Sequence, residues 1–312
     1  MIDLHQLVRW LPEQRWFGGK GRRIADVDLV DETVIEEDDP NLVLAVVAVH
    51  YEDGEDSDLY HLPLLVDGDG TFRDATEDPE RLVVLGELMA HGTPLKGTDS
   101  VFNFAGPGLD PLSEQVWSTA RPAGAEQSNS SVVMDESIIV KFLRRVQPGI
   151  NPEREITRLL TNQGFPHIPE HVGEITFDGS LADEDITMDL AVAQRYLAEA
   201  TEGWATTLHH LHALYDAAPG GTVPAAELTA LTEDLAAESL RALEELGDVT
   251  AGLHVALTKE ELDAESLPAL INHQDLQRWA DDLLTAAGSL AGAGVTEVHK
   301  WGHGLEQRAQ RL

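Results

Sequence analysis

The chain has 312 residues, of which 42% are hydrophobic, and this is enough for two compact domains with their own cores. Its 56 acidic and 21 basic residues give a formal net charge of −35, which argues against nucleic acid or an anionic membrane as the main partner, because both require a positive surface. The absence of cysteine excludes a disulfide framework, a thiolate metal site and a cysteine nucleophile.

No basic segment followed by a long apolar run opens the chain, and nowhere do eighteen consecutive apolar residues occur. We therefore expect a cytoplasmic protein that is neither exported nor membrane-spanning.

The first part of the chain, residues 1–115, has the pattern of a separate small domain. Apolar residues on one face predict a short helix at 2–11, and a second helix is expected at 79–89. Between them, apolar or alternating runs at 27–35, 42–51 and 59–66 are separated by turns rich in aspartate and glycine. This pattern is typical of a β-meander.

Residues 15–22, RWFGGKGR, invite comparison with a phosphate-binding loop of the type Gly-x-x-x-x-Gly-Lys-Ser/Thr. The comparison fails at Gln14, where glycine is required, and at Gly21, which follows the lysine. The better interpretation is a glycine turn packed by Trp10, Trp16 and Phe17. If the turn has a functional role, we expect it to be a contact with the next domain.

Residues 121–156 carry, in order, the parts of a site for nucleotide phosphates. Two apolar runs at 131–134 and 137–140 flank Asp135 and Glu136, which predicts a β-hairpin. Lys141 ends the second run, so its ammonium would reach the α and β phosphates of a nucleotide. The nucleotide would lie under the polar turn that precedes the hairpin, whose candidate residues are Gly124, Gln127, Ser128, Asn129, Ser130 and Ser131.

A helix is predicted to follow, with Asn151 as its N-cap and Pro152 at its first position. It carries Glu155, the expected ion-pair partner of Lys141. The neighbouring Arg144 and Arg145 complete one of the few basic clusters, which suits a phosphate site. A hairpin followed by a helix is common in α/β proteins, so ordinary surface charge is the alternative for the lysine.

The rest of the chain is expected to be a strand at 186–193 and then helices at 204–218, 225–246, 249–257 and 276–290, with a final stretch through 312. His209, His210 and His212 lie near Asp216, but a third and fourth ligand are not evident. Exposed helix histidines are therefore the favoured interpretation over a metal site.

Three strings together resemble bacterial maltokinases: LPEQRWFGGKGR, GAEQSNSS and VKFLRRVQPGINPEREI. That family phosphorylates maltose with ATP, and glucosamine kinases with the same N-terminal cap are near relatives. The resemblance runs along the whole chain and implies an α+β fold. It places a β-meander cap domain at 1–115 and a kinase-like N-lobe, an antiparallel sheet with one helix, at 116–200. A helical region that begins the C-lobe follows at 201–312.

The same resemblance implies that Gln194 and Tyr196 belong to a hinge whose backbone binds adenine. It implies ATP and Mg²⁺ as cofactors and maltose or a related sugar, such as glucosamine, as the acceptor. It also implies a role in trehalose and glycogen metabolism, with trehalose synthase as a partner.

The family's catalytic loop, His-Gly-Asp-x-His-x-x-Gln, and its later Asp-Phe-Glu metal motif do not occur in the sequence. Residues 246–254 are similar to the helix before that loop, so we expect the catalytic segment to begin about where Leu312 ends. No catalytic residue and no metal ligand is therefore identified. The nearest substitute, residues 273–276, has Ala280 where an amide ligand is needed, and Asn272 or Asp275 is interpreted as a helix N-cap.

Three hypotheses follow from the sequence. The first is a maltokinase-type sugar kinase whose catalytic half is not in this chain, so that it binds nucleotide and transfers little phosphate. The second is an active kinase that uses unrecognised residues, which the missing carboxylates disfavour because Mg²⁺ is the main charge neutraliser in phosphoryl transfer. The third is a non-catalytic binding or interaction module.

Overall fold

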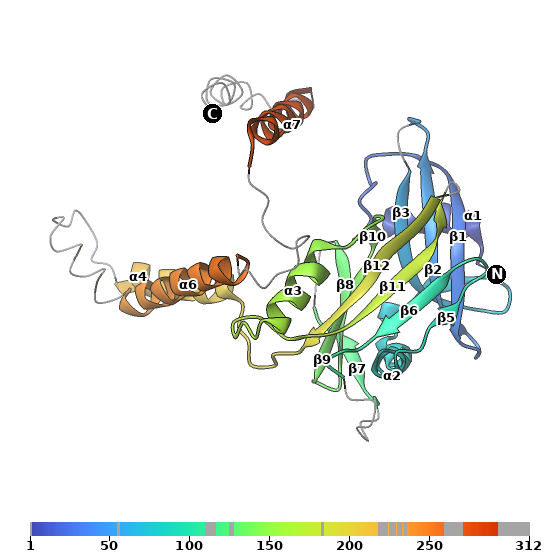
Figure 1. Cartoon of the computed structure of the whole chain (residues 1–312), viewed down its shortest axis with the longest axis horizontal. Helices are drawn as coiled ribbons and strands as arrows, with labels where there is room; N and C mark the ends of the chain where they lie inside the picture. Colours follow the sequence, from blue (N-terminus) through green and yellow to red (C-terminus); the bar gives the residue numbers. More distant parts are fainter. Residues whose placement is uncertain are drawn as a thin grey trace. The chain divides into compact units, whose positions relative to one another are not determined.

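The computed structural model describes residues 2–54, 57–109, 117–124, 128–181, 184–217, 236–258 and 271–292, together with residues 224, 229 and 233. The chain forms two compact units, Met1–Val249 and Thr250–Leu312. Both sheets lie in the first unit (Figure 1). Strands and helices together make an α+β fold, as the sequence predicts.

The first sheet is antiparallel and has the strand order β1-β2-β3-β10, with β4 beside β3. Its strands are β1 (Ile24–Glu36), β2 (Asn41–Tyr51), β3 (Asp58–Val66), β4 (Phe72–Asp74) and β10 (Arg145–Val146). The three long strands confirm the predicted meander. The helix α1 (Leu4–Trp10) precedes them, and a 3₁₀ turn, Leu11–Glu13, follows it.

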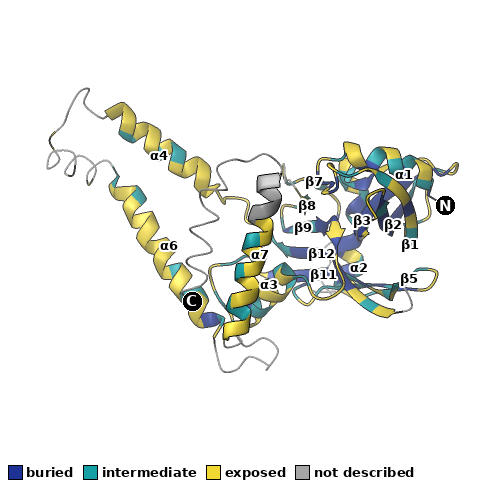
Figure 2. Ribbon diagram, turned by 90° about the horizontal axis from the view of Figure 1, so that it is seen from above, coloured by how far each residue is buried: buried dark blue, intermediate teal, exposed yellow. Residues whose placement is uncertain are grey.

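Both faces of this sheet are covered, which explains why β2 and β3 are apolar almost without interruption. One face of β2 joins a core shared with the second sheet, and the other joins a core with α1 and the glycine turn. The first face is formed by Leu42, Leu44 and Val46, and the second by Val43, Val47 and Val49. Figure 2 shows β2 and β3 largely in dark blue, the colour of buried residues.

The second sheet is also antiparallel and has the order β5-β6-β11-β12-β9-β8-β7. Its strands are β5 (Leu95–Lys96), β6 (Val101–Ala105), β7 (Ala120–Pro122), β8 (Asn129–Met134), β9 (Ile138–Leu143), β11 (His171–Leu181) and β12 (Glu184–Arg195). Helix α3 (Pro152–Asn162) follows β10 in the chain. The strands β5 and β6 come from the predicted cap region and extend the edge of β11.

The predicted hairpin turn between β8 and β9 is confirmed. Asp135 and Glu136 both have positive φ, 47° and 48°, as a two-residue type I′ turn requires. The Asp135 carboxylate accepts hydrogen bonds from the backbone N–H and the hydroxyl of Thr119, at 2.9 and 2.7 Å. The aspartate therefore ties the turn to the segment that enters β7.

The remaining helices are α2 (Val84–His91), which follows the 3₁₀ segment Pro79–Leu82, α4 (Gly203–Ala217), α6 (Ala237–Ala256) and α7 (His273–Gly292). The predicted break between residues 246 and 249 is wrong, because α6 runs through Gly247 without interruption. A glycine inside a helix costs only about 1 kcal/mol relative to alanine, which the helix tolerates. The N-cap interpretation of Asn272 is confirmed, since its Oδ1 accepts from the backbone N–H of Gln274 at 2.8 Å.

The predicted final helical stretch through 312, and much of 225–246, lie outside the described residues. Within the described part of the chain, α4 has no buried residue, and α6 is exposed over most of its length (Figure 2). Among the residues that the structure describes, no helix is long and apolar enough to cross a bilayer.

Arg144 joins the two sheets through a buried ion pair. Its side chain has no exposed surface, and its Nη2 donates to both carboxylate oxygens of Asp74, at 2.8 and 2.7 Å. The guanidinium also lies over the ring of Trp16, 4.6 Å from its centroid, and its Nε donates to the Ser130 hydroxyl at 3.0 Å. The glycine turn thus makes the contact with the next domain that the sequence left open.

The prediction that Arg144 and Arg145 form a phosphate cluster with Lys141 is therefore wrong. A buried guanidinium requires a carboxylate partner, and Asp74 supplies it from the first sheet. Arg145 likewise pairs with a carboxylate of the first sheet, that of Asp58. Arg144 thus holds the two sheets together, whereas Arg145 stabilises the pairing of β10 with β3 within the first sheet.

We expect Arg144→Met to lower the free energy of unfolding by about 3–5 kcal/mol, because the substitution leaves the Asp74 carboxylate buried without its partner. Urea denaturation at neutral pH measures the loss. The double variant Arg144→Met/Asp74→Asn removes both charges and should lose clearly less. Equal losses in the single and double variants would contradict an origin in the unpaired carboxylate.

Candidate nucleotide-binding site

The polar turn lies between β7 and β8 at one edge of the second sheet. The backbone N–H of Ala123 donates to the carbonyl of Ser131 at 2.9 Å and closes the base of the turn. Gly124 has a φ of 119°, where residues with a Cβ are strained, although the space around it is open. Gln127, a predicted member of the turn, lies outside the described residues. The turn thus requires glycine for its backbone conformation.

Lys141 lies in β9, directly opposite Ser131 of β8 and Val192 of β12. Because cross-strand partners share a face of the sheet, the lysine is on the same face as Ser131, which the sequence predicted as the last residue of the turn and which the structure places in β8. Its Nζ lies 3.0 Å from Oε2 and 3.2 Å from Oε1 of Glu153. The two side chains keep 27% and 34% of their surface exposed, so the ion pair is accessible from solvent.

The prediction of Glu155 as the partner of Lys141 is wrong by two helical positions. Helix α3 begins where the sequence indicates, since the Asn151 side chain accepts from the backbone N–H of Glu153 at 2.9 Å and Pro152 occupies the first position. Residues two apart in a helix point to different faces, so the pairing of Glu153 turns Glu155 outward, where it is exposed.

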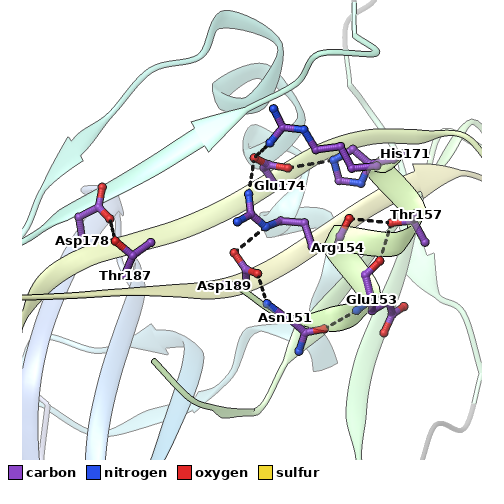
Figure 3. Close-up of polar contacts among 10 residues, drawn as sticks. Asn151, Glu153, Arg154, Thr157, His171, Glu174, Asp178, Thr187 and Asp189 are labelled. Carbon is purple, nitrogen blue, oxygen red and sulfur yellow. Dashed lines mark hydrogen bonds and ion pairs between the residues drawn. The ribbon is translucent and has the colours of Figure 1, made fainter. Parts of the chain in front are cut away.

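A buried ionic network holds α3 against β11 and β12 (Figure 3). Arg154 contacts Glu174 of β11, Nη1 to Oε1, at 2.8 Å, and Asp189 of β12, Nε to Oδ1, also at 2.8 Å. The second contact is an ion pair without hydrogen-bond alignment. The other oxygen of Glu174 contacts Nε2 of His171 at 2.9 Å.

The register of the sheet explains how both carboxylates reach the same helix. Glu174 pairs with Val192, which is also the partner of Lys141, so these side chains share one face. The pairing shifts by one residue at Leu190, which places Asp189 opposite Thr176 and so on the face of Glu174. An unshifted strand would have turned Asp189 into the core.

Sequence reasoning missed this network. The available signal was the presence of Glu174 and Asp189 within strand segments that are otherwise apolar, because a carboxylate is almost never buried unless it is paired. The signal does not identify the partner, which depends on the bulge and on the position of α3.

The predicted hinge residues leave the sheet beside β9. Gln194 pairs with Ile139 in the strand ladder, and the backbone N–H of Tyr196 donates to the carbonyl of Ser137 at 2.9 Å. The Tyr196 hydroxyl accepts from Arg121 at 3.0 Å. The amide of Tyr196 is thus engaged within the protein, and its role toward adenine stays a prediction.

A separate hollow of about 600 Å³ lies along the tip of the β11–β12 hairpin. Its lining includes Asp99, Asp178 and Asp185, and the Asp178 carboxylate accepts from the Thr187 hydroxyl at 2.6 Å (Figure 3). An acidic lining repels phosphate, so this hollow does not suit a nucleotide. Within the described ranges, no group of three or more side chains is arranged to hold a metal ion.

The arrangement around Lys141 suits the binding of a phosphorylated ligand. An ammonium oriented by a carboxylate attracts phosphate oxygens, and the space around Gly124, at the base of the neighbouring turn, is open. The turn and the lysine both belong to the second antiparallel sheet. The turn joins β7 to β8, Lys141 lies in β9, and α3, which carries Glu153, lies between β9 and β11 in the chain.

The chain is similar to known proteins in both sequence and fold. Residues 10–92 match the maltokinase N-terminal cap domain. Over 259 residues the chain is 26% identical to the glucosamine kinase of Mycolicibacterium smegmatis (strain ATCC 700084 / mc(2)155). The aligned region covers 72% of this chain and 62% of that protein. The resemblance to cap-bearing sugar kinases that the sequence motifs indicate is therefore confirmed.

Solved structures of glucosamine kinase share the fold. One, in complex with glucosamine, ADP and inorganic phosphate, has a TM-score of 0.52 at 19% identity and covers 92% of this chain and 58% of its own. A second, crystal form B, has a TM-score of 0.54 at 20% identity and covers 96% of this chain and 60% of its own. The chain thus spans less than two thirds of the length of these relatives.

The ionic network gives the folded state a defined response to acid. Burial alone would raise the pKa of Glu174, but the hydrogen bond from His171 and the charges of Arg154 and Arg158 outweigh it and hold the pKa below the ordinary 4.5. A carboxyl group with a lowered folded-state pKa stabilises the fold above its unfolded-state pKa and loses this contribution as the pH falls through the folded-state value.

We therefore expect the wild type to be more stable than Glu174→Gln above about pH 4.5, by a margin that shrinks as the pH falls further. Urea denaturation as a function of pH measures the margin. The exposed Glu155→Gln, on α3, serves as the control and should match the wild type throughout. A margin for Glu174→Gln that does not change with acidification would contradict the lowered pKa.

Proposed function

We propose that this chain is the nucleotide-binding part of an ATP-dependent sugar kinase. The observation that carries the proposal is the ion pair between Lys141 and Glu153 beside the glycine turn, on the seven-stranded antiparallel sheet. In protein kinases a lysine of the third strand binds the α and β phosphates and is held by a glutamate of the following helix. The likeness of the chain to glucosamine kinases supports the same roles here.

In this proposal Lys141 binds the phosphates and Glu153 fixes the position of the ammonium. The N–H groups of the turn around Gly124 bind the terminal phosphates. A residue with a Cβ at position 124 would strain the backbone conformation of the turn and so weaken this binding. Mg²⁺, when bound, neutralises phosphate charge during transfer. The general base and the metal ligands are not assigned to any residue of this chain.

The acceptor is proposed to be a sugar, and two candidates have separate support. Maltose is favoured by the match of residues 10–92 to the maltokinase cap domain. Glucosamine is favoured by the relative in Mycolicibacterium smegmatis and by the solved complex with glucosamine and ADP. An association with trehalose synthase and a role in trehalose or glycogen metabolism remain predictions from the resemblance alone.

We expect Lys141→Met to weaken the binding of Mg-ATP by about tenfold or more, since a charge-assisted contact to phosphate contributes roughly 1.5–3 kcal/mol. Glu153→Gln should weaken binding less, because this residue positions the lysine. Calorimetric titration of the 312-residue chain measures both.

Two matched controls sharpen this experiment. Glu155→Gln lies in the same helix and Lys96→Met lies in the same sheet, and both residues are exposed. Both controls should bind Mg-ATP as the wild type does. Equal affinity of the wild type and Lys141→Met would refute the assignment, and the same titrations with maltose and glucosamine test the two acceptors.

A further inference from the structure

We propose that Arg154 is a positioning residue for Lys141, because it fixes the first turn of α3 to two strands and thereby holds Glu153 against the lysine. The expected effect of Arg154 on nucleotide affinity rests on the proposed function. Its expected effect on the position and reactivity of Lys141 does not. The inference depends on the contacts among α3, β9, β11 and β12 (Figure 3).

The two carboxylates that bind Arg154 are almost completely buried. The side chain of Asp189 is 1% exposed, that of Glu174 is 8% exposed, and that of Arg154 is 12% exposed. Charges at such sites require opposite charges, so the folded chain is strongly constrained to keep the guanidinium between the two strands. A planar guanidinium can contact two carboxylates at once, which an ammonium on a flexible stem does poorly.

Arg154 directly follows Glu153, so a constraint on one residue is transmitted to the other through a single peptide unit. The same turn is held a second time by Asp189, whose Oδ2 accepts from the backbone N–H of Asn151 at 2.6 Å. At the other end of α3, the hydroxyl of Thr161 accepts from the backbone N–H of His171 at 2.8 Å. The helix is therefore attached to the sheet at both ends.

Arg158 offers a matched control within the same network. Its Nη1 lies 3.2 Å from the same oxygen of Glu174 that contacts Arg154, but its side chain is 51% exposed. The contact that Arg154 makes with Asp189 has no counterpart among the contacts described for Arg158. Removal of the Arg158 contact should therefore break one ion pair to Glu174 while the first turn of α3 stays attached to the sheet.

The test measures the reactivity of the lysine in the absence of any nucleotide. The full chain is treated with an acetylating reagent, and the rate at Lys141 is followed by peptide mass spectrometry for wild type, Glu153→Gln, Arg154→Lys, Asp189→Asn and Arg158→Lys. Asp189→Asn keeps the side-chain volume and so guards against a variant that fails to fold. The exposed Lys20 and Lys96 control for differences in labelling conditions between samples, and urea denaturation of each variant reports general unfolding.

We expect Arg154→Lys and Asp189→Asn to accelerate acetylation of Lys141 by roughly 2- to 150-fold, the range of coupling between neighbouring residues, and Glu153→Gln to do the same. Arg158→Lys should leave the rate unchanged. In the Glu153→Gln background, Arg154→Lys should add nothing. Unchanged rates at Lys141, or equal acceleration at Lys20 and Lys96, would overturn the positioning role.

Mg-ATP titration of the same variants separates this inference from the proposed function. If both are right, Arg154→Lys weakens nucleotide binding in the wild type and has no further effect in Lys141→Met. A wild type that binds no nucleotide refutes the proposed function, while the acetylation rates still decide whether Arg154 positions the lysine.

Discussion

The structure depends on one constraint, that a charge buried between or against sheets must meet an opposite charge. Arg144 meets Asp74 where the two sheets face one another, and Arg154 meets Glu174 and Asp189 where α3 covers the second sheet. These contacts fix the two elements on either side of Lys141, since Arg144 contacts Ser130 of β8 and Arg154 adjoins Glu153 of α3. The partly exposed lysine is thus oriented by neighbours that are themselves held by buried charge.

The same constraint explains how a protein with a net charge of −35 can present a site for an anion. Arg144 and Arg154 are buried and engaged by carboxylates within the fold, so their charges are neutralised there and add little to the surface potential near the turn. The proposed site would use a positioned ammonium and backbone N–H groups, which act at short range and do not need a basic surface. The acidic surface then favours solubility without preventing a local phosphate contact.

Local signals in the sequence were sufficient for the elements that local chemistry determines. The meander strands follow from apolar runs between glycine and aspartate turns, the hairpin from Asp135 and Glu136, and the start of α3 from Asn151 and Pro152. Lys141 could be selected because it ends an apolar run. These features depend on neighbours within a few residues and survive any tertiary arrangement.

What the sequence could not determine depends on contacts between distant segments. Glu153 rather than Glu155 meets the lysine because of the rotation of α3 about its axis. Arg154 sets this rotation through its contacts with Glu174 and Asp189. The side chains of these two carboxylates share a face of the sheet only because β12 carries a bulge. Arg144 was assigned to the wrong site because its partner, Asp74, lies 70 residues earlier in the chain. The periodicity of apolar residues within a short stretch of sequence reveals neither the rotation of α3 nor the pairing of Arg144 with Asp74.

The two predicted N-terminal regions exchange strands, and this bears on how the candidate site is supported. Residues 95–96 and 101–105 extend the second sheet at the edge of β11, while residues 145–146 return to the first sheet beside β3. Each region therefore completes a sheet that belongs mainly to the other, and neither sheet edge is left open at these positions. Because β11 carries Glu174 and β10 follows the strand of Lys141, strand pairing with the cap region supports the same elements that position the lysine. The candidate site is thus a property of the combined sheets, and its rigidity cannot be assigned to the predicted N-lobe alone.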